Sequence, residues 1–223
     1  METTTSFFGQ DVDPHVRGWL HTPDGSRGDA LILTHGAGGN CAAPLLVALA
    51  ETFCGHGYTV LRCDLPFRQE RRFGPPFPGN AERDRAGLRN AVTAMRKIVD
   101  GKVFLGGHSY GGRQATMLCA EEPDLVSGLL LLSYPLHPPR KPEQLRIQHL
   151  PDLRTPSLFV SGTRDPFGSV EEIKKARQLI PARNELMTVD GAGHDLGFKG
   201  KSRNNELPER IVEAFGRLNE INS

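Results

Sequence analysis

The sequence predicts an α/β fold with a mostly parallel central sheet and helices on both of its faces. Short apolar runs alternate with longer segments whose apolar residues recur at helical spacing, which is typical of consecutive strand–helix–strand units. Several of the apolar runs, such as residues 30–34, lack alternating polar residues, as expected of strands that are covered on both faces. The length of 223 residues fits a single domain, 1–223, in which we expect the Thr/Ser-rich residues 1–10 to be flexible.

The expected elements follow one another in a regular order. Residues 15–21 predict a strand that flanks the sheet in the antiparallel direction. Asn80 is the expected N-cap of a long helix, and Pro208 suits the first turn of the closing helix. The remaining pattern predicts strands at residues 30–34, 58–63, 103–105, 128–132, 157–160 and 185–189, and helices at 45–53, 80–99, 111–120, 170–180 and 208–221.

Two proline-rich segments, residues 66–80 and 135–156, interrupt this order. Each follows a predicted strand, so both are expected at the carboxyl edge of the sheet, where open α/β sheets bind ligands. The second segment is too short to form a large cap domain. We therefore expect a site with a minimal cap or none, open to solvent or lightly covered.

Composition and charge exclude several classes of function. The formal net charge of +1 is unlike the basic surface of a nucleic-acid-binding protein or a polybasic membrane anchor. No apolar stretch is long enough for a membrane-spanning helix, and residues 1–10 do not resemble a signal peptide. The four cysteines show no zinc-binding spacing, which favours free, buried thiols and a cytoplasmic location.

A glycine-rich turn around Ser109 predicts a nucleophile. Gly107, Ser109 and Gly111 form the pattern G-x-S-x-G between a predicted strand and a predicted helix. Such a turn is sharp and strained, and it projects the serine hydroxyl above the sheet, while larger side chains two positions away would collide with neighbouring backbone. The alternative is a glycine-rich structural turn or a phosphate-binding loop.

The loop at residues 34–40 follows the first core strand and predicts an oxyanion hole. A tetrahedral intermediate needs about two fixed hydrogen-bond donors. One is expected from the backbone N–H of Tyr110, just after the nucleophile, and the other from Ala37, with Gly38 as second choice. A tight connection without a catalytic task is the alternative, and His35 is interpreted as a structural residue of the loop.

Asp165 and His194 complete the predicted catalytic set. Asp165 follows the strand at residues 157–160, and His194 follows the strand at 185–189. The chain order Ser, Asp, His, with each residue after a strand, suits a histidine base oriented by a carboxylate. Asp190 and Asp195 compete for the role of Asp165, although Asp195 is adjacent to the histidine and badly placed to orient it.

With these motifs, the sequence resembles the α/β-hydrolase superfamily over nearly its whole length. Within it, the chain is similar to the testis-expressed protein 30-like group, related to dienelactone hydrolases, in residues 34–39, 64–67, 106–113, 133–136 and 159–165. The resemblance implies an eight-stranded sheet and hydrolysis by the Ser109, Asp165 and His194 triad. Some relatives in this group are thought to serve as non-enzymatic subunits of larger assemblies.

The leading hypothesis is a serine hydrolase that cleaves ester or thioester bonds of small molecules, with no metal or organic cofactor. Alternatives are a catalytically silent interaction module and a peptidase. The expected partner is the small-molecule substrate, with neither nucleic acid nor membrane, and a homodimer is compatible with the sequence. Candidate substrate contacts are Arg113, Phe67 and Tyr134, and the arginine suggests a carboxylate- or phosphate-bearing substrate. Arg68, Arg71, Arg72 and Arg164 are further candidates for this role.

Overall fold

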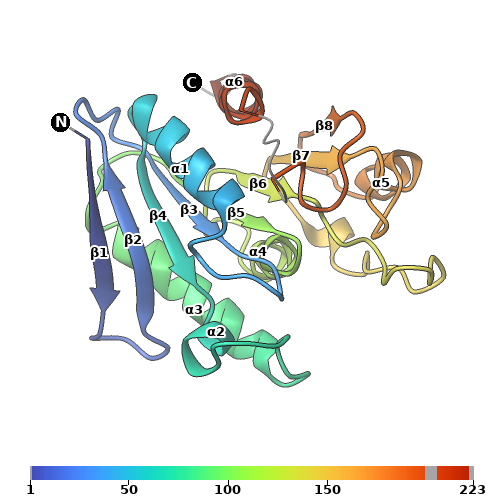
Figure 1. The fold of residues 1–223 in the computed structure, drawn as a ribbon, viewed down its shortest axis with the longest axis horizontal. Helices are drawn as coiled ribbons and strands as arrows, with labels where there is room; N and C mark the ends of the chain where they lie inside the picture. The colour runs from blue at the N-terminus through green and yellow to red at the C-terminus, as the bar shows by residue number, and fades with distance from the viewer. Residues whose placement is uncertain (1, 199–204, 221–223) are drawn as a thin grey trace.

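An eight-stranded sheet forms the centre of the molecule, in the order β1-β2-β4-β3-β5-β6-β7-β8 (Figure 1). We describe it from a computed structural model, which covers residues 2–198 and 205–220. The six strands from β3 to β8 pair in parallel, as the sequence predicts. The strands are β1 (Thr3–Gly9), β2 (Val16–Thr22), β3 (Ala30–Thr34), β4 (Thr59–Asp64), β5 (Val103–His108), β6 (Leu129–Leu132), β7 (Ser157–Gly162) and β8 (Asn184–Val189).

The two N-terminal strands run antiparallel at one edge. β2 pairs antiparallel with β4, which confirms the strand expected at residues 15–21. The expected flexibility of residues 1–10 is wrong for β1, because every residue from Thr3 to Gly9 pairs with β2. Threonine and phenylalanine are compatible with extended backbone, but it is the pairing with β2 that makes this segment a strand.

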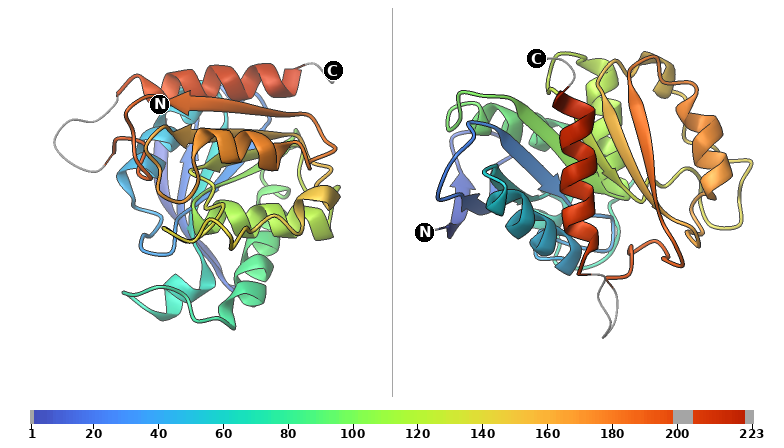
Figure 2. Two further views of the ribbon diagram at one scale, coloured as in Figure 1. Left: turned by 90° about the vertical axis from the view of Figure 1, so that its right-hand side faces the viewer. Right: turned by 90° about the horizontal axis from the view of Figure 1, so that it is seen from above.

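Helices cover both faces of the sheet. α1 and α6 pack side by side over one face, and α3 and α4 lie over the other, together with α5 (Figures 1 and 2). Side chains of β3 alternate between the two cores: Leu31 and Leu33 face α1 and α6, whereas Ile32 faces α3 and α4. The helices are α1 (Pro44–Gly55), α2 (Pro66–Glu70), α3 (Asn80–Met95), α4 (Tyr110–Glu121), α5 (Val170–Arg177) and α6 (Leu207–Glu220), with a short 3-10 turn η1 (Leu150–Asp152).

Several helix boundaries differ from expectation. α3 ends at Met95, and its N-cap is Gly79 rather than Asn80, whose side chain accepts the Phe77 N–H at 2.7 Å in the turn before the helix. α2 begins at a proline within a segment where no helix was expected. The predicted last residue of the closing helix, Ile221, lies outside the described residues.

The α/β fold with little or no cap is confirmed, since the proline-rich segments form only α2, η1 and connecting loops. All four cysteines are buried with free thiols. Among the described helices, none is both long and apolar enough to cross a lipid bilayer.

Candidate active site

Ser109 occupies a strained turn between β5 and α4. Its φ of 52° and ψ of −117° lie in a region that non-glycine residues seldom adopt. A Cβ on Gly107 would come within 2.5 Å of the Gly112 nitrogen, and one on Gly111 within 2.6 Å of the His35 carbonyl oxygen. Glycine is therefore required on both sides of Ser109, for the steric reason that the G-x-S-x-G pattern suggested.

Three loops bring the predicted hydroxyl, imidazole and carboxylate into one hydrogen-bonded row. His194 Nε2 lies 2.8 Å from Ser109 Oγ. His194 Nδ1 lies 2.8 Å from Oδ2 of Asp165 and 3.0 Å from Oδ1. A ring that donates from Nδ1 to a carboxylate keeps Nε2 as an acceptor. The arrangement thus orients the free nitrogen lone pair of His194 toward the serine hydroxyl.

The carboxylate that faces His194 is the one predicted. The Asp165 side chain is only 3% exposed, and its Oδ1 also accepts the Phe167 N–H at 2.9 Å. Asp190 instead accepts the Thr163 hydroxyl at 3.3 Å, and Asp195 accepts the Gly197 N–H at 3.3 Å. Neither competitor of Asp165 makes a hydrogen bond to His194 in the part of the chain that the structure describes.

Two further residues hold His194, and no motif in the sequence points to either of them. The Phe167 ring stacks on the imidazole, with ring centroids 4.1 Å apart and planes inclined by 28°. His108 Nε2 donates to the His194 carbonyl oxygen at 2.7 Å. Burial lowers the pKa of His108 to about 4, so its ring is neutral near pH 7. In the sequence, the only feature that distinguishes them is their position beside a predicted catalytic residue. His108 precedes Ser109, and Phe167 follows Asp165 by two residues.

The loop after β3 forms a tight turn whose two central amides make no hydrogen bond among the described residues. The Gly39 N–H closes the turn on the Gly36 carbonyl oxygen at 3.0 Å. This hydrogen bond uses neither the Ala37 nor the Gly38 N–H, which are the central amides of the turn. A cavity next to Ser109 is lined by both residues. These are the two amides of this loop that the sequence nominated as oxyanion donors.

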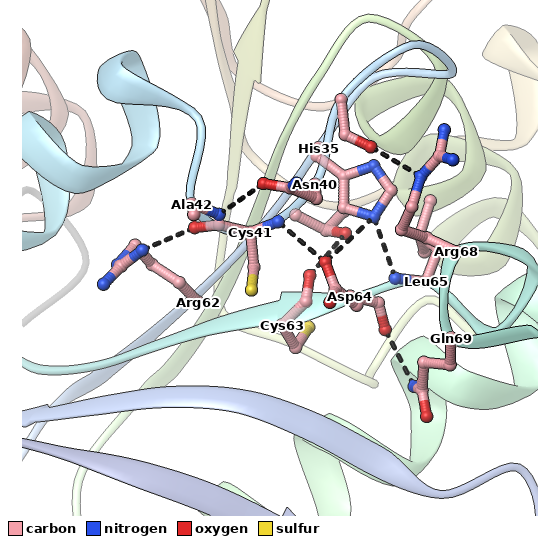
Figure 3. A network of polar contacts seen from close by, with 12 residues as sticks. His35, Asn40, Cys41, Ala42, Arg62, Cys63, Asp64, Leu65, Arg68 and Gln69 are labelled. Atoms are coloured by element: carbon pink, nitrogen blue, oxygen red, sulfur yellow. Dashed lines mark hydrogen bonds and ion pairs between the residues drawn. The ribbon is translucent and has the colours of Figure 1, made fainter. Parts of the chain in front are cut away.

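Two buried side chains, His35 and Arg68, fix the orientation of these amides. Figure 3 shows both side chains, with His35 hydrogen-bonded to Leu65. His35 Nδ1 donates to the Gly36 carbonyl oxygen at 2.8 Å, and its Nε2 accepts the Leu65 N–H at 3.1 Å. Arg68 Nη2 donates to the Ala37 carbonyl oxygen at 2.9 Å. In a trans peptide the C=O and the next N–H point in opposite directions. His35 consequently orients the Ala37 N–H, and Arg68 orients the Gly38 N–H.

The sequence nominates Arg68 as a candidate substrate contact, but its guanidinium is engaged within the fold. It is 7% exposed, and besides Ala37 it donates to the carbonyl oxygens of Gly39 at 2.7 Å, Gly74 at 2.8 Å and Arg71 at 3.0 Å. His35 is 1% exposed, and burial lowers its pKa, so it is neutral and structural, as the sequence analysis interpreted it.

Tyr110 is anchored by a buried carboxylate. Because Tyr110 is the first residue of α4, its N–H has no carbonyl partner within the helix. The phenol donates to Asp84 Oδ2 at 2.8 Å, and Asp84 Oδ1 accepts the Phe67 N–H at 3.0 Å. Burial raises the pKa of Asp84 above its usual range. Asp84, which the sequence analysis did not single out, thereby ties the start of α4 to α2 and α3.

A cavity of about 870 Å³ opens at this edge of the sheet. Its lining includes Ser109, His194 and Arg113. Phe67 and Tyr134, the other tentative substrate contacts, do not line it and are 1% and 2% exposed. Phe67 packs on His35 and on Tyr110, and the Tyr134 hydroxyl donates to the Arg146 carbonyl oxygen at 2.8 Å. Their aromatic rings support the walls of the cavity rather than face its interior.

Comparison with known proteins assigns the fold to a family. A family model described as an alpha/beta hydrolase domain matches residues 27–220. The chain belongs to the alpha/beta hydrolase family. Membership in this family supports hydrolase activity for the protein.

Several solved structures superpose on almost the whole chain. A dienelactone hydrolase from Anabaena variabilis has a TM-score of 0.74 at 20% identity and covers 97% of both chains. A serine hydrolase without a lid from Xanthomonas campestris has a TM-score of 0.74 at 15% identity, over 97% of this chain and 94% of its own. Est1E from Butyrivibrio proteoclasticus reaches 0.71 at 19% identity, over 96% and 98%. At such identities the likeness concerns the fold alone.

Proposed function

We propose that this alpha/beta hydrolase is a serine hydrolase that cleaves ester or thioester bonds of small molecules. The observation that carries the proposal is the row of Ser109, His194 and Asp165, with 2.8 Å from the serine oxygen to the imidazole and 2.8 Å from the imidazole to the carboxylate. The adjoining cavity of about 870 Å³ is of the size that small-molecule sites have.

In the proposed reaction, His194 Nε2 takes the proton of Ser109 as Oγ attacks the carbonyl carbon of the substrate. Asp165 stabilises the imidazolium that forms. The amides of Tyr110 and of Ala37 or Gly38 donate to the oxyanion of the tetrahedral intermediate. His194 then protonates the leaving alcohol or thiol, and water, deprotonated by the same imidazole, hydrolyses the acyl group from Ser109.

Preorganisation of the donors supports this chemistry. The oxyanion donors help only if they already point toward the position where negative charge develops. His35 and Arg68 restrain the peptides of the loop, and Asp84 restrains Tyr110. The strained backbone of Ser109 also supports a functional role for this residue, since strain of this kind is concentrated at functional sites.

Steady-state hydrolysis of matched para-nitrophenyl esters and acyl thioesters of two to eight carbons tests the proposal. We expect turnover of at least one series, an initial burst of leaving group equal to the enzyme concentration where deacylation is slow, and a loss of about 10⁴-fold or more in kcat for Ser109→Ala. Turnover that survives Ser109→Ala would contradict the proposal. Absence of turnover by the folded wild-type protein across both series would favour the silent interaction module instead.

We also propose a reducing, cytoplasmic location. The four buried free thiols support it, because paired cysteines are the rule in oxidising compartments. Fractionation of cells that express the chain in its native form tests this: recovery in the secreted fraction would contradict the proposal.

A further inference from the structure

We propose that Arg113 and Arg146 form an anion-binding subsite within the Ser109 cavity, and that the substrate is an ester or thioester that also carries a carboxylate or a phosphate. This inference rests on the proposed function and adds to it the charge of the molecule that is cleaved.

Both arginines line the cavity that contains Ser109 and His194. Arg113 lies in the first turn of α4, and its backbone N–H donates to the Ser109 carbonyl oxygen at 3.0 Å. Arg146 comes from the connection between β6 and η1, far from α4 in the sequence. Two separate segments thus supply a guanidinium to the same cavity as the nucleophile.

The guanidinium of Arg113 has no partner within the described part of the chain. Its Nε is buried without a hydrogen-bond acceptor, and no described carboxylate lies within 4.0 Å of it. Buried donors without an acceptor are rare, and each one calls for an explanation such as a missing ligand. The Nη groups of Arg113 likewise make no hydrogen bond among the described residues, so they are free to donate to an anion in the cavity that this side chain lines.

Arg146 is held in place but retains most of its donors. Its backbone N–H donates to the Leu136 carbonyl oxygen at 2.8 Å, and its own carbonyl oxygen accepts the Tyr134 hydroxyl at 2.8 Å. The guanidinium makes one hydrogen bond among the described residues, from Nη1 to the Pro135 carbonyl oxygen at 3.2 Å. A guanidinium has five N–H donors, so four remain for a ligand.

The electrostatic surroundings favour an anion. Burial and, after it, the positive charge of Arg113 lower the pKa of Arg146, so the charge of Arg113 reaches this guanidinium group. The charge of Arg113 also contributes, after burial, to the lowering of the pKa of His149 to about 4. Asp195 lines the same cavity, but it forms no ion pair with either arginine among the described residues.

Two guanidinium groups suit a planar or tetrahedral oxyanion, since their paired N–H donors match carboxylate and phosphate oxygens. Hydrogen bonds between charged groups contribute about 1.5–3 kcal/mol, which corresponds to a preference of roughly 10- to 150-fold over a neutral analogue. The subsite would bind the part of the substrate that does not react and hold the ester carbonyl beside Ser109.

Matched pairs of acidic and neutral esters test the proposal. The pairs are meta-acetoxybenzoate and its methyl ester, meta-acetoxyphenyl phosphate and its dimethyl ester, and mono-para-nitrophenyl adipate and its methyl ester. The first two place the anion on the leaving group, as carboxylate or phosphate, and the third places it on the acyl group. We expect at least one acidic member to exceed its neutral partner in kcat/KM by about 10-fold or more.

Arg113→Met and Arg146→Met keep most of the side-chain length and remove the charge. Either variant is expected to reduce the acidic-to-neutral ratio of kcat/KM about 10-fold, so the test survives if one of them fails to fold. Arg154→Met is the control for net charge, because Arg154 is exposed and lies before β7, at the opposite edge of the sheet. Wild-type enzyme without any acidic preference, or a preference that both variants retain, would overturn the proposal.

Binding separates this proposal from the proposed function. Calorimetry with Ser109→Ala protein measures the affinity for intact meta-acetoxybenzoate and for its methyl ester without turnover. We expect the acid to bind about 10-fold more tightly, and Arg113→Met in the same background to abolish the difference. If wild-type enzyme cleaves no ester but this difference is found, the anion subsite stands and the hydrolase proposal fails. If esters are cleaved but neither measurement shows a charge preference, the hydrolase proposal stands and the anion subsite fails.

Discussion

Arg68 lies behind the wall of the Ser109 cavity that residues 36–39 form, whereas Arg113 lines the wall that it forms with Arg146. The two guanidinium groups differ in what surrounds them. Arg68 donates to four main-chain carbonyl oxygens, and those contacts fix the loop that holds Ala37 and Gly38. Arg113 has a buried Nε without any acceptor among the described residues. The same residue type therefore stabilises the fold on one wall and is left available for a ligand on the other. Variants of the two should differ in which substrates they affect.

The largest effect is expected on the Arg68 wall. Arg68→Met leaves four carbonyl oxygens without their donor, so we expect the free energy of unfolding to fall by about 2–4 kcal/mol. Because the Gly38 amide loses its restraint, kcat should fall about 10- to 100-fold, equally for acidic and neutral esters. Arg68→Lys should recover part of the rate. Kinetics on the paired esters, at a temperature where circular dichroism shows folded protein, measures this. A loss confined to acidic esters would make Arg68 a substrate contact and break the comparison.

Acid should expose a property of the fold beyond these two walls, namely its buried neutral histidines. Burial lowers the pKa of His21, His108 and His149 to about 4 each, from an ordinary value of about 6.5. Between these two values the unfolded chain binds protons that the folded chain does not, so the stability present above pH 6.5 decreases as the pH falls toward 4.

We expect urea unfolding at pH 6 to show a free energy about 1–3 kcal/mol lower than at pH 7. A flat profile between pH 6.5 and 5 would show that these rings titrate normally in the folded protein. For Arg113→Met, the pKa of His149 measured by nuclear magnetic resonance should rise, because one of its causes is removed. The same substitution at Arg68 should leave the pKa of His149 unchanged.

A smaller effect is expected where Tyr134 supports the Arg113 wall. Tyr134→Phe removes the hydrogen bond to the Arg146 carbonyl oxygen, which should lower the free energy of unfolding by about 1 kcal/mol. The preference for acidic esters should decrease, by less than in Arg146→Met. Tyr110→Phe is the matched variant on the other wall: it removes the hydrogen bond to Asp84 and should lower kcat for both members of each ester pair. Identical kinetic profiles for the two variants would refute the separate roles of the walls.

The smallest effect is expected at Arg164, which the sequence also nominated for substrate binding. Its side chain is exposed and does not line the cavity. Arg164→Ala should change the free energy of unfolding by less than about 0.5 kcal/mol and leave the acidic-to-neutral ratio unaltered. If Arg164→Ala lost the preference for acidic esters, the anion subsite would have to include Arg164, which contradicts its assignment to Arg113 and Arg146.

The elements with a local cause could be predicted from the sequence. Ser109, Asp165 and His194 each follow a strand, and the carboxyl ends of parallel strands meet at one edge, so their convergence follows from the fold class. The glycines around Ser109 likewise reflect a clash with adjacent backbone. β1 was missed because its pairing with β2, and not its composition, decides that it is ordered.

The direction of individual side chains could not be predicted in this way. Arg68 reaches the carbonyl oxygens of Ala37 and Gly39, about thirty residues earlier in the chain. Phe67 and Tyr134 are aromatic, as residues that line substrate pockets often are, yet both are buried behind the wall of the Ser109 cavity. Asp84 carries no motif and acquires its role only because α3 packs beside the start of α4. Long-range packing decides each of these, and spacing along the sequence does not record it.

The most direct test of the account is covalent labelling with an alkyl fluorophosphonate, read by intact mass and by peptide mapping. An activated serine beside an oriented imidazole should take up one phosphonyl group per chain, on Ser109. Ser109→Ala should take up none, and His194→Ala should react far more slowly. Folded wild-type protein that remains unlabelled, or that carries the label on another residue, would contradict the assignment of Ser109 as the nucleophile.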